Sequence, residues 1–183
     1  MRYPIPPVIT FMPTSATSLL IRAGGPADIP AIQAIAQATW PAAYYPHILG
    51  TEQLAYMLDL LYSTEALRMA MTEKDQRFLM LGTAEGPVGF ASYTPRYRGS
   101  GVTHLNKLYV LPNTQGTGAG KVLLARVIAE ANRLGADSLE LNVNKRNPAV
   151  AFYQHMGFRI KRDEVIDIGQ GYVMDDHVME LIL

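Results

Sequence analysis

The residues of this chain that could do chemistry are concentrated in a glycine-rich segment, Leu105–Val122, with the sequence LNKLYVLPNTQGTGAGKV. An apolar stretch of strand character leads into a loop that carries Gly116, Gly118 and Gly120, and a helix is expected to start there. Glycines let a backbone approach an anion closely because no Cβ intervenes, and a helix N-terminus presents free N–H groups and the positive end of its dipole. The segment therefore predicts a site for a pyrophosphate.

Other glycine-loop motifs fit this segment less well. A Walker A loop requires glycine at the position of Gln115 and serine or threonine at the position of Val122. A dinucleotide-binding fingerprint requires a third glycine where Lys121 stands, and it usually lies in an N-terminal βαβ unit. A turn that only caps a helix needs a single glycine. The pattern that remains is Q-x-x-G-x-G, Gln115–Gly120, directly after a strand.

A second candidate motif follows the helix that this loop begins. After an alternating, strand-like stretch, Ser138–Val143, the chain continues with NKRNPAVAFYQHMGF, residues 144–158. Asn147 is a good N-cap, Pro148 suits the first helical turn and Gly157 ends the helix. The sequence therefore predicts a short helix that includes a Phe-Tyr pair.

The two motifs together resemble the signatures of the GCN5-related N-acetyltransferases. The first is similar to the loop with which this family binds the pyrophosphate of acyl-CoA, and the second is similar to its signature N-x-x-A-x-x-F-Y-x-x-x-G-F. Both occur in the family's order, and the resemblance covers roughly Leu19–Leu183. It implies an α/β fold of the α+β kind, with a mixed, mainly antiparallel central sheet of about seven strands and helices on both faces. It also implies two strands that splay apart, so that the pantetheine arm of acetyl-CoA enters the gap like an extra strand.

The resemblance also assigns coenzyme-binding residues. The pantetheine amides and the thioester carbonyl would be bonded by the main chain of Lys107, Leu108, Tyr109 and Val110, opposite a second strand at Leu139–Asn142. Asn147 would reach the pantetheine. The pyrophosphate would be held by Gln115, Gly116, Thr117, Gly118, Ala119, Gly120 and Lys121. Candidates for the coenzyme's other phosphate are Lys121, Arg126 and Arg146, and for the two arginines a solvated role is equally expected.

In this family the transfer needs a proton donor for the departing thiolate and a base for the acceptor amine. Tyr153 matches the family's tyrosine that protonates the thiolate, with a core aromatic residue as the alternative role. The strand before the loop offers His104 and Asn106 where a glutamate often occurs. His104 has a suitable intrinsic pKa for a base, but a lone strand histidine is more often structural. Tyr93, Glu140 and a chain of water molecules remain alternatives, and we slightly favour water.

The acceptor is expected to bind between the segment Trp40–His47, which is aromatic and stiffened by proline, and the C-terminal hairpin. A buried lid without substrate contact is an equally good role for this segment. Gln53, Tyr56-Met57 and Tyr172–Glu180 resemble a bacterial branch of the family that includes polyamine acetyltransferases. A polyamine site needs several carboxylates. The candidates, for each of which a solvated surface role is favoured, are Glu52, Asp59, Asp175 and Asp176.

Composition fits one compact enzyme domain. The chain has 183 residues, 49% of them hydrophobic and 17% charged, which is enough to bury a core. Lysine plus arginine and aspartate plus glutamate both number 16, which disfavours binding to nucleic acid or a membrane but permits a local basic patch. The chain has no cysteine, so disulfides and thiolate chemistry are excluded, and we expect no metal site. We expect a loosely held N-terminal arm, Met1–Ser18, a single domain, 19–183, and a cytoplasmic location.

Periodicity and turn signals predict helices and strands without internal repeats. The expected helices are Pro26–Trp40, ended by Pro41, then Thr51–Leu61, Ser63–Met71, Gly118–Leu134 and one that follows Asn147. The expected strands are Leu19–Arg22, Arg77–Thr83, Val88–Tyr97, His104–Leu111, Ser138–Val143, Phe158–Ile168 and Tyr172–Leu183.

The residues and the resemblance together indicate an acetyl-CoA-dependent N-acetyltransferase that transfers the acetyl group directly to a primary amine of a small molecule or a peptide. No covalent enzyme intermediate is required. The main alternative is a non-catalytic acyl-CoA-binding sensor that keeps the loop but lacks a working base. A P-loop phosphotransferase is disfavoured by Val122, and a homodimer is left open.

Overall fold

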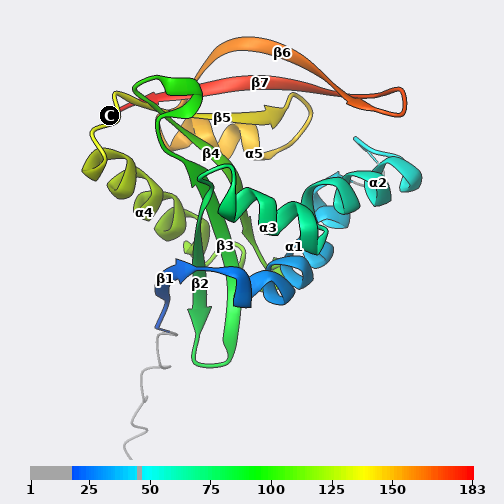
Figure 1. Ribbon diagram of the computed structural model, residues 1–183. Coiled ribbons are helices and arrows are strands. Elements are labelled where there is room, and N and C mark those ends of the chain that lie inside the picture. The colour runs from blue at the N-terminus through cyan, green and yellow to red at the C-terminus, as the bar shows by residue number, and fades with distance from the viewer. Residues whose placement is uncertain (1–17, 45–46) are drawn as a thin grey trace, which may run out of the picture.

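The computed structural model describes residues 18–44 and 47–183. In this part of the chain a seven-stranded sheet has the order β1-β2-β3-β4-β5-β7-β6, with helices on both faces (Figure 1). Neighbouring strands are antiparallel except β4 and β5, which run parallel. The predicted mixed, mainly antiparallel sheet is therefore confirmed. Most of the predicted N-terminal arm and residues 45–46 of the predicted acceptor segment lie outside the described residues.

The elements follow one another in the order that the sequence predicts. The strands are β1 Leu20–Gly24, β2 Arg77–Thr83, β3 Gly86–Thr94, β4 Val102–Val110, β5 Ser138–Asn144, β6 Arg159–Gly169 and β7 Tyr172–Ile182. The α-helices are α1 Ile29–Tyr44, α2 Thr51–Tyr62, α3 Thr64–Thr72, α4 Ala119–Arg133 and α5 Ala149–His155. Short 3₁₀ turns are η1 Pro26–Asp28, η2 Tyr97–Gly99 and η3 Pro112–Thr114. The largest differences from the predicted bounds are at the ends of α1 and β3.

Helix α1 continues past Pro41, so the helix end predicted at this proline was wrong. A proline inside a helix lacks the N–H that would bond the carbonyl four residues earlier, here that of Gln37. Gln37 and Pro41 both lie on the exposed face of α1, where water can satisfy the free carbonyl. The buried face, which includes Ile32 and Trp40, holds the helix against the sheet. Packing therefore outweighs the missing hydrogen bond, and the helix extends to Tyr44.

Two hydrophobic clusters cover the opposite faces of the sheet. Helices α4 and α5 pack on one face, over a cluster that includes Leu124, Val127 and Leu139. Helices α1, α2 and α3 pack on the other face, over a cluster that includes Ile32 and Leu67. This second cluster reaches β2, β3 and β4, but among the described residues it includes none of β5. The side of β5 that faces α1 is therefore free to carry polar side chains, whereas β6 and β7 each contribute a partly buried residue to this cluster, Ile168 and Met174.

Strands β4 and β5 pair only along their first residues. The register runs from Val102 opposite Ser138 to Leu105 opposite Leu141 and ends there. The pairing that continues is that of β4 with β3 and of β5 with β7. Asn106 is an extra residue in β4 without a partner on β3, and such a bulge bends its strand. The two strands diverge after Leu105 and Leu141, which confirms the predicted splayed pair, and we call this gap the fork.

The bulge also sets which side chains of β4 face which helices. Leu105, Leu108 and Val110 belong to the cluster under α4 and α5, whereas Tyr109 belongs to the cluster under α1. His104 alternates with Leu105 and so lies on the same side as Tyr109. We call this side of the sheet the α1 face.

Candidate active site

The glycine loop connects the end of β4 to the start of α4. Gly116 and Gly118 have φ angles of 80° and 87°, a conformation that favours glycine, and Gly118 is the N-cap of α4. A Cβ built on either glycine meets no atom within 4 Å, so the space in front of the loop is open. The first hydrogen bond of α4 joins the N–H of Val122 to the carbonyl of Gly118, which leaves the N–H groups of residues 119–121 without intrahelical partners. The loop therefore presents several donors to an anion.

Side chains hold the loop in this form. Thr117 Oγ1 donates to the carbonyl of Thr114 at 2.6 Å, and Gln115 Nε2 donates to the carbonyl of Val110 at 3.3 Å. Lys121 is exposed in the first turn of α4. The predicted pyrophosphate-binding residues thus lie together around one helix N-terminus, with Gln115 joining the loop to the end of β4.

The two arginines considered for the coenzyme's other phosphate are engaged within the protein. Arg126 forms an ion pair with Glu130 at 2.9 Å on the exposed side of α4. Arg146 donates to the carbonyl of Ile48 at 2.9 Å and so joins the loop after β5 to the segment before α2. These contacts favour a structural role for both.

Helix α5 carries the predicted proton donor. Asn147 is buried, and its Oδ1 accepts a hydrogen bond from the N–H of Ala149 at 2.9 Å. Tyr153 is also buried, and its ring packs edge-on against Phe152 and Phe158 at centroid distances of 5.2 and 5.6 Å. Burial raises the pKa of the Tyr153 phenol, so the phenol is protonated at neutral pH and can donate a proton.

The second motif matches the family signature at its alanine, Phe-Tyr and Gly-Phe positions. Counted from the Phe-Tyr pair, the asparagine of the signature falls on Arg146, so the pantetheine role was carried to Asn147 one residue out of register. In the structure Arg146 is exposed and Asn147 is buried. Asn147 acts on the pKa of the Tyr44 phenol, which places these two side chains together. Of Arg146 and Asn147, the buried Asn147 is therefore the better placed to reach the pantetheine.

Aromatic side chains line the α1 face beside the fork. The hydroxyl of Tyr44, at the end of α1, lies 3.4 Å from the hydroxyl of Tyr109 on β4. Trp40 Nε1 donates to the hydroxyl of Tyr62 at 3.2 Å. Burial raises the pKa of Tyr44, and the carboxylate of Asp176 on β7 raises it further. Tyr44 thus brings the predicted acceptor segment to the fork and close to β7.

Helix α2 contacts the C-terminal hairpin, β6–β7, through Tyr56. The Tyr56 hydroxyl donates to the carbonyl of Ile168 at 2.5 Å, and its ring centroid lies 5.7 Å from that of Tyr172. The structure therefore brings Tyr56 of α2 into contact with the β6–β7 hairpin, the two parts whose sequence resembles polyamine acetyltransferases.

His104 lies on β4 opposite Glu140 of β5, just before the fork opens. Its ring is buried and stacks on Tyr97 at a centroid distance of 4.4 Å, and within the described residues its Nδ1 has no hydrogen-bond partner. Burial lowers the pKa of His104 to about 4. The intrinsic pKa that made His104 attractive as a base does not hold in the folded protein. The imidazole is neutral at neutral pH but binds a proton weakly.

The alternative bases fare differently. Tyr93 belongs to the cluster under α4, so it lies on the face opposite to His104. Asn106 is exposed on the bulge and accepts a hydrogen bond from Thr94 Oγ1 at 2.9 Å. The structure thus separates Tyr93 from the α1 face and leaves His104, Glu140 and water there.

Three of the carboxylates considered for the acceptor, and Glu140, which was considered as a base, have partners or lie in solvent. Glu140 and Asp175 each accept a hydrogen bond from a lysine ammonium, at 2.6 Å in both cases. Glu52 and Asp59 are exposed on α2. These contacts favour the surface or structural roles for these four residues.

Asp176 differs from these carboxylates. It is only 5% exposed, and in the part of the chain that the structure describes no lysine, arginine or histidine nitrogen lies within 4 Å of its carboxylate. Burial raises the pKa of Asp176 to about 6, and Asp175 and Glu164 contribute to the increase. The alternation of β7 turns Asp175 and Asp176 to opposite faces, but it does not say which of the two faces α1.

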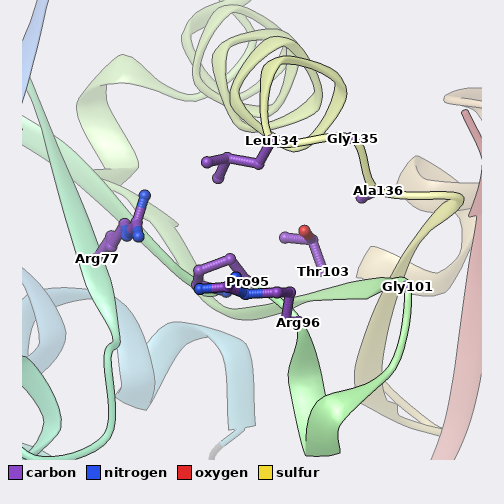
Figure 2. Close-up of a pocket in the computed structure, with 8 residues that line it drawn as sticks. All are labelled: Arg77, Pro95, Arg96, Gly101, Thr103, Leu134, Gly135 and Ala136. Atoms are coloured by element: carbon purple, nitrogen blue, oxygen red, sulfur yellow. The ribbon is translucent and has the colours of Figure 1, made fainter.

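A cavity of about 130 Å³ lies away from these residues, at the C-terminal end of α4 and the start of β4 (Figure 2). Its lining residues are Arg77, Pro95, Arg96, Gly101, Thr103, Leu134, Gly135 and Ala136. None of them is a predicted site residue, and the glycine loop is at the other end of α4. The cavity is therefore not the predicted coenzyme site.

The fold and the fork define an acetyltransferase of the GNAT class, and comparison with known proteins agrees. Residues 49–174 match the family model described as "Acetyltransferase (GNAT) domain". The uncharacterized N-acetyltransferase Rv2669 of Mycobacterium tuberculosis (strain ATCC 25618 / H37Rv) is 31% identical over 154 residues, which cover 83% of this chain and 96% of that relative. The chain therefore belongs to the GNAT family of N-acetyltransferases, the family that its two sequence motifs resemble.

Two further relatives differ in what they support. The peptidyl-lysine N-acetyltransferase YjaB of Escherichia coli (strain K12) is 32% identical over 108 residues, 58% of each chain. The PaiA N-acetyltransferase of Thermoplasma acidophilum, crystallised with coenzyme A, has a TM-score of 0.75 at 23% identity and covers 91% of this chain and 99% of its own. This second likeness supports the fold alone. The predicted polyamine branch is not specifically supported by these relatives.

Two absences complete the description of the site. Among residues 18–44 and 47–183, no helix is both long and apolar enough to span a membrane. In the same residues, no three histidine, cysteine, aspartate or glutamate side chains are grouped so as to hold a metal ion.

Proposed function

We propose that this protein is an acetyl-CoA-dependent N-acetyltransferase that transfers the acetyl group directly to a primary amine of a small molecule or a peptide. The observation that carries the proposal is the fork between β4 and β5, which leads to the glycine loop and the N-terminus of α4. An extended arm with amide groups fits an open strand edge, and a pyrophosphate fits free N–H groups at a helix N-terminus. Coenzyme A contains both parts in that order.

The residues at the fork fit this coenzyme. Beyond Leu105 the edge of β4 that faces the fork has no partner on β5, so main-chain groups of Leu108, Tyr109 and Val110 are available to pantetheine amides. Residues 115–121 would hold the pyrophosphate, mainly through backbone N–H groups, and Lys121 would add a positive charge. Asn147 would reach the pantetheine from the start of α5.

Direct transfer needs a polarised carbonyl and a proton for the leaving thiolate. Backbone N–H groups at Leu108–Val110 would stabilise the oxyanion, and the loss of one such donor costs about 3 kcal/mol of barrier in comparable enzymes. Tyr153 would give its phenol proton to the sulfur as the C–S bond breaks. Its raised pKa supports this role, because the phenol then remains protonated across the neutral range.

The acceptor would bind on the α1 face beside the fork, between Tyr44 and the β6–β7 hairpin. Glu164 and Asp176 are opposite one another on β6 and β7, and their carboxylates favour a cationic amine. The name of YjaB, a peptidyl-lysine acetyltransferase, supports a lysine side chain as the acceptor. The resemblance of the C-terminal segment to polyamine acetyltransferases supports a polyamine. Both acceptors present a primary ammonium.

The test is steady-state release of CoA thiol from acetyl-CoA over a panel of diamines, polyamines and lysine peptides, together with calorimetric titration of acetyl-CoA. We expect binding of acetyl-CoA and thiol release with at least one primary amine. Binding without release for every amine would favour the acyl-CoA sensor, for which the weak basicity of His104 is the supporting observation. The absence of both would overturn the proposal.

We further propose that residues 19–183 form a single acetyltransferase domain. Limited proteolysis should cut within residues 1–18 and leave the remainder intact; early cuts elsewhere would argue against one domain. The cytoplasmic location and the homodimer remain predictions, to be tested by cell fractionation and by sedimentation.

A further inference from the structure

Asp176 occupies a particular place on the α1 face. It lies on β7, opposite Asn144 of β5 and Glu164 of β6, so β5 alone separates it from the fork. Neighbouring strands are about 4.8 Å apart, so the side chain of Asp176 is within reach of a molecule that lies over the fork. Its carboxylate also acts on the pKa of Tyr44, whose hydroxyl lies 3.4 Å from the hydroxyl of Tyr109 on β4. Asp176 is therefore close to both walls of the fork.

Tyr44 also relates Asp176 to the proposed proton donor. Burial and then the neighbouring Tyr44 raise the pKa of the Tyr153 phenol. Asp176 and Tyr153 thus lie near the same tyrosine, although they come from β7 and α5. Acyl transfer to an amine needs a proton acceptor for the amine and a proton donor for the thiolate around one carbon atom. A carboxylate and a phenol in this arrangement meet the two needs.

The surroundings of Asp176 lack a compensating cation. Glu164 of β6, Asn142 of β5 and Tyr44 of α1 lie near it on this face, and the adjacent Asp175 and His177 of β7 act on it from the other face. Burial and the two carboxylates raise its pKa to about 6, while Asn142 and His177 oppose the shift. Because no lysine or arginine within the described residues neutralises it, the carboxylate favours a bound ammonium or a proton.

Other titratable groups lie on this side of β4 and β5. Lys107 has its ammonium 5.1 Å from the centroid of the Tyr62 ring and a pKa lowered by burial to about 8, so it is cationic at neutral pH. The buried His104 has a pKa lowered to about 4. Glu140 is held in an ion pair with the ammonium of Lys161 at 2.6 Å. A general base is most effective when its pKa lies near the working pH. Asp176, a carboxylate on this face without a cationic partner among the described residues, has a pKa raised to about 6 and meets that condition.

We propose that the carboxylate of Asp176 accepts the proton that the acceptor ammonium loses, directly or through one water molecule. This assignment rests on the function proposed above. The ammonium gives one proton to Asp176, and the free amine attacks the thioester carbon to form the C–N bond. As the C–S bond breaks, the thiolate takes the phenol proton of Tyr153. The remaining surplus proton of the amide nitrogen returns to the tyrosinate, and Asp176 releases its proton to solvent.

The test is the pH profile of kcat/KM for one good amine substrate in the wild type and in Asp176→Asn. In the wild type, kcat/KM should rise with pH through a pKa near 6 and then level, and we call this rise the limb near pH 6. In Asp176→Asn, kcat/KM should fall by about 100-fold or more and lose this limb, with unchanged acetyl-CoA affinity by calorimetry. Asp176→Glu, which keeps a carboxylate, should retain the limb and serves as the second variant if Asp176→Asn does not fold.

Asp175→Asn is the matched control. Asp175 is the adjacent carboxylate, but it lies on the opposite face of β7, more than half exposed and paired with Lys145. Exposed ion pairs contribute little, so this variant should keep kcat/KM within about threefold of the wild type and keep the limb near pH 6.

A second substrate separates proton acceptance from amine binding. An amine whose pKa lies below the assay pH arrives neutral and needs no base, so it should restore Asp176→Asn to within about tenfold of the wild type. Persistence of the limb in Asp176→Asn, or a raised KM with unchanged kcat, would overturn the assignment of Asp176 as the base. Thiol release by the wild type would still support the proposed enzyme function. No thiol release by the wild type with any amine would overturn both.

Discussion

The two sides of the proposed active site are built in different ways. On the coenzyme side one continuous segment, 105–121, supplies the strand edge, the glycine loop and the helix N-terminus, and the binding groups belong to the backbone. On the α1 face each side chain comes from a different element: Tyr44 from α1, His104 from β4 and Asp176 from β7. Local spacing determines the first arrangement, whereas tertiary packing determines the second. A sequence therefore reveals the coenzyme side much more readily.

The two sides also differ in their cost to the fold. The coenzyme side keeps its donors open, since a Cβ on Gly118 would meet no atom within 4 Å. The α1 face buries titratable groups, and burial raises the pKa of Asp176 to about 6 and lowers that of His104 to about 4. Both shifts favour the neutral form, because a buried charge without a partner is costly. We expect mutations on the coenzyme side to change binding and those on the α1 face to change chemistry and stability.

The largest effect is expected at the glycine loop. Gly118→Val puts a β-branched side chain into the open space before the loop, at a φ of 87°. We expect the affinity for acetyl-CoA to fall by about 100-fold or more, equivalent to about 3 kcal/mol, while the fold is largely retained. Calorimetric titration measures the affinity. Unchanged affinity in a folded Gly118→Val protein would remove this loop from the site.

Gly135→Val is the matched control for the strain at this position. Gly135 follows the other end of α4 with a φ of 72°, and a Cβ there also meets no atom within 4 Å. Each valine in a left-handed conformation should cost about 1–3 kcal/mol of stability. Only Gly118→Val should lose the coenzyme, so an equal loss of affinity in both variants would point to unfolding instead.

The reach of sequence-based prediction follows the same division. Turn glycines and apolar alternation act within a few residues, so they predicted the loop, α4 and most strand bounds. Local rules were wrong at Pro41, where packing of α1 outweighs one missing hydrogen bond. They were also misleading at His104, because an intrinsic pKa takes no account of burial.

Asp176 illustrates why the α1 face could not be predicted. Asp175 and Asp176 are equivalent neighbours in the sequence, yet the first is exposed and paired with Lys145 and the second is buried. Which of the two faces α1 depends on the register of β7 with β5, where Asp176 is opposite Asn144. A shift of one residue would exchange the two carboxylates, and that register depends on pairing between distant segments.

The next largest effect is expected for the proton donor. In Tyr153→Phe the ring keeps its packing between Phe152 and Phe158, and only the hydroxyl is lost. We expect kcat to fall by about tenfold or more with little change in acetyl-CoA affinity, because the thiolate needs the proton only as it leaves. Tyr93→Phe removes another buried hydroxyl from the same cluster under α4 and α5, on β3, and should keep kcat. Equal kcat in Tyr153→Phe and the wild type would exclude Tyr153 from the mechanism.

A smaller, opposite effect is expected for stability at Asp176. Its pKa of about 6 in the folded protein exceeds the ordinary value of 3.8, so the folded state binds the proton more tightly. This contribution to stability is fully present below pH 3.8 and is lost as the pH rises through about 6, by up to about 3 kcal/mol. Asp176→Asn, which stays neutral, should therefore have a higher Tm than the wild type at pH 8. Calorimetry at pH 4 should show no such gain, and an equal gain at both pH values would contradict the ionisation argument.

The smallest catalytic effect is expected at His104, which stands where the family often has a glutamate. Because its folded pKa of about 4 lies below the ordinary value of 6.5, His104 contributes stability above pH 6.5 that is lost as the pH falls through about 4. His104→Gln should reduce this acid sensitivity in thermal unfolding, whereas the exposed control His155→Gln should not. In both variants kcat/KM should stay within about threefold of the wild type, with the limb near pH 6 in place, because neutral imidazole this weakly basic gains little by accepting a proton. Loss of the limb in His104→Gln alone would identify His104 on β4, and not Asp176 on β7, as the general base. The base would then lie at the strand position where the family often has a glutamate.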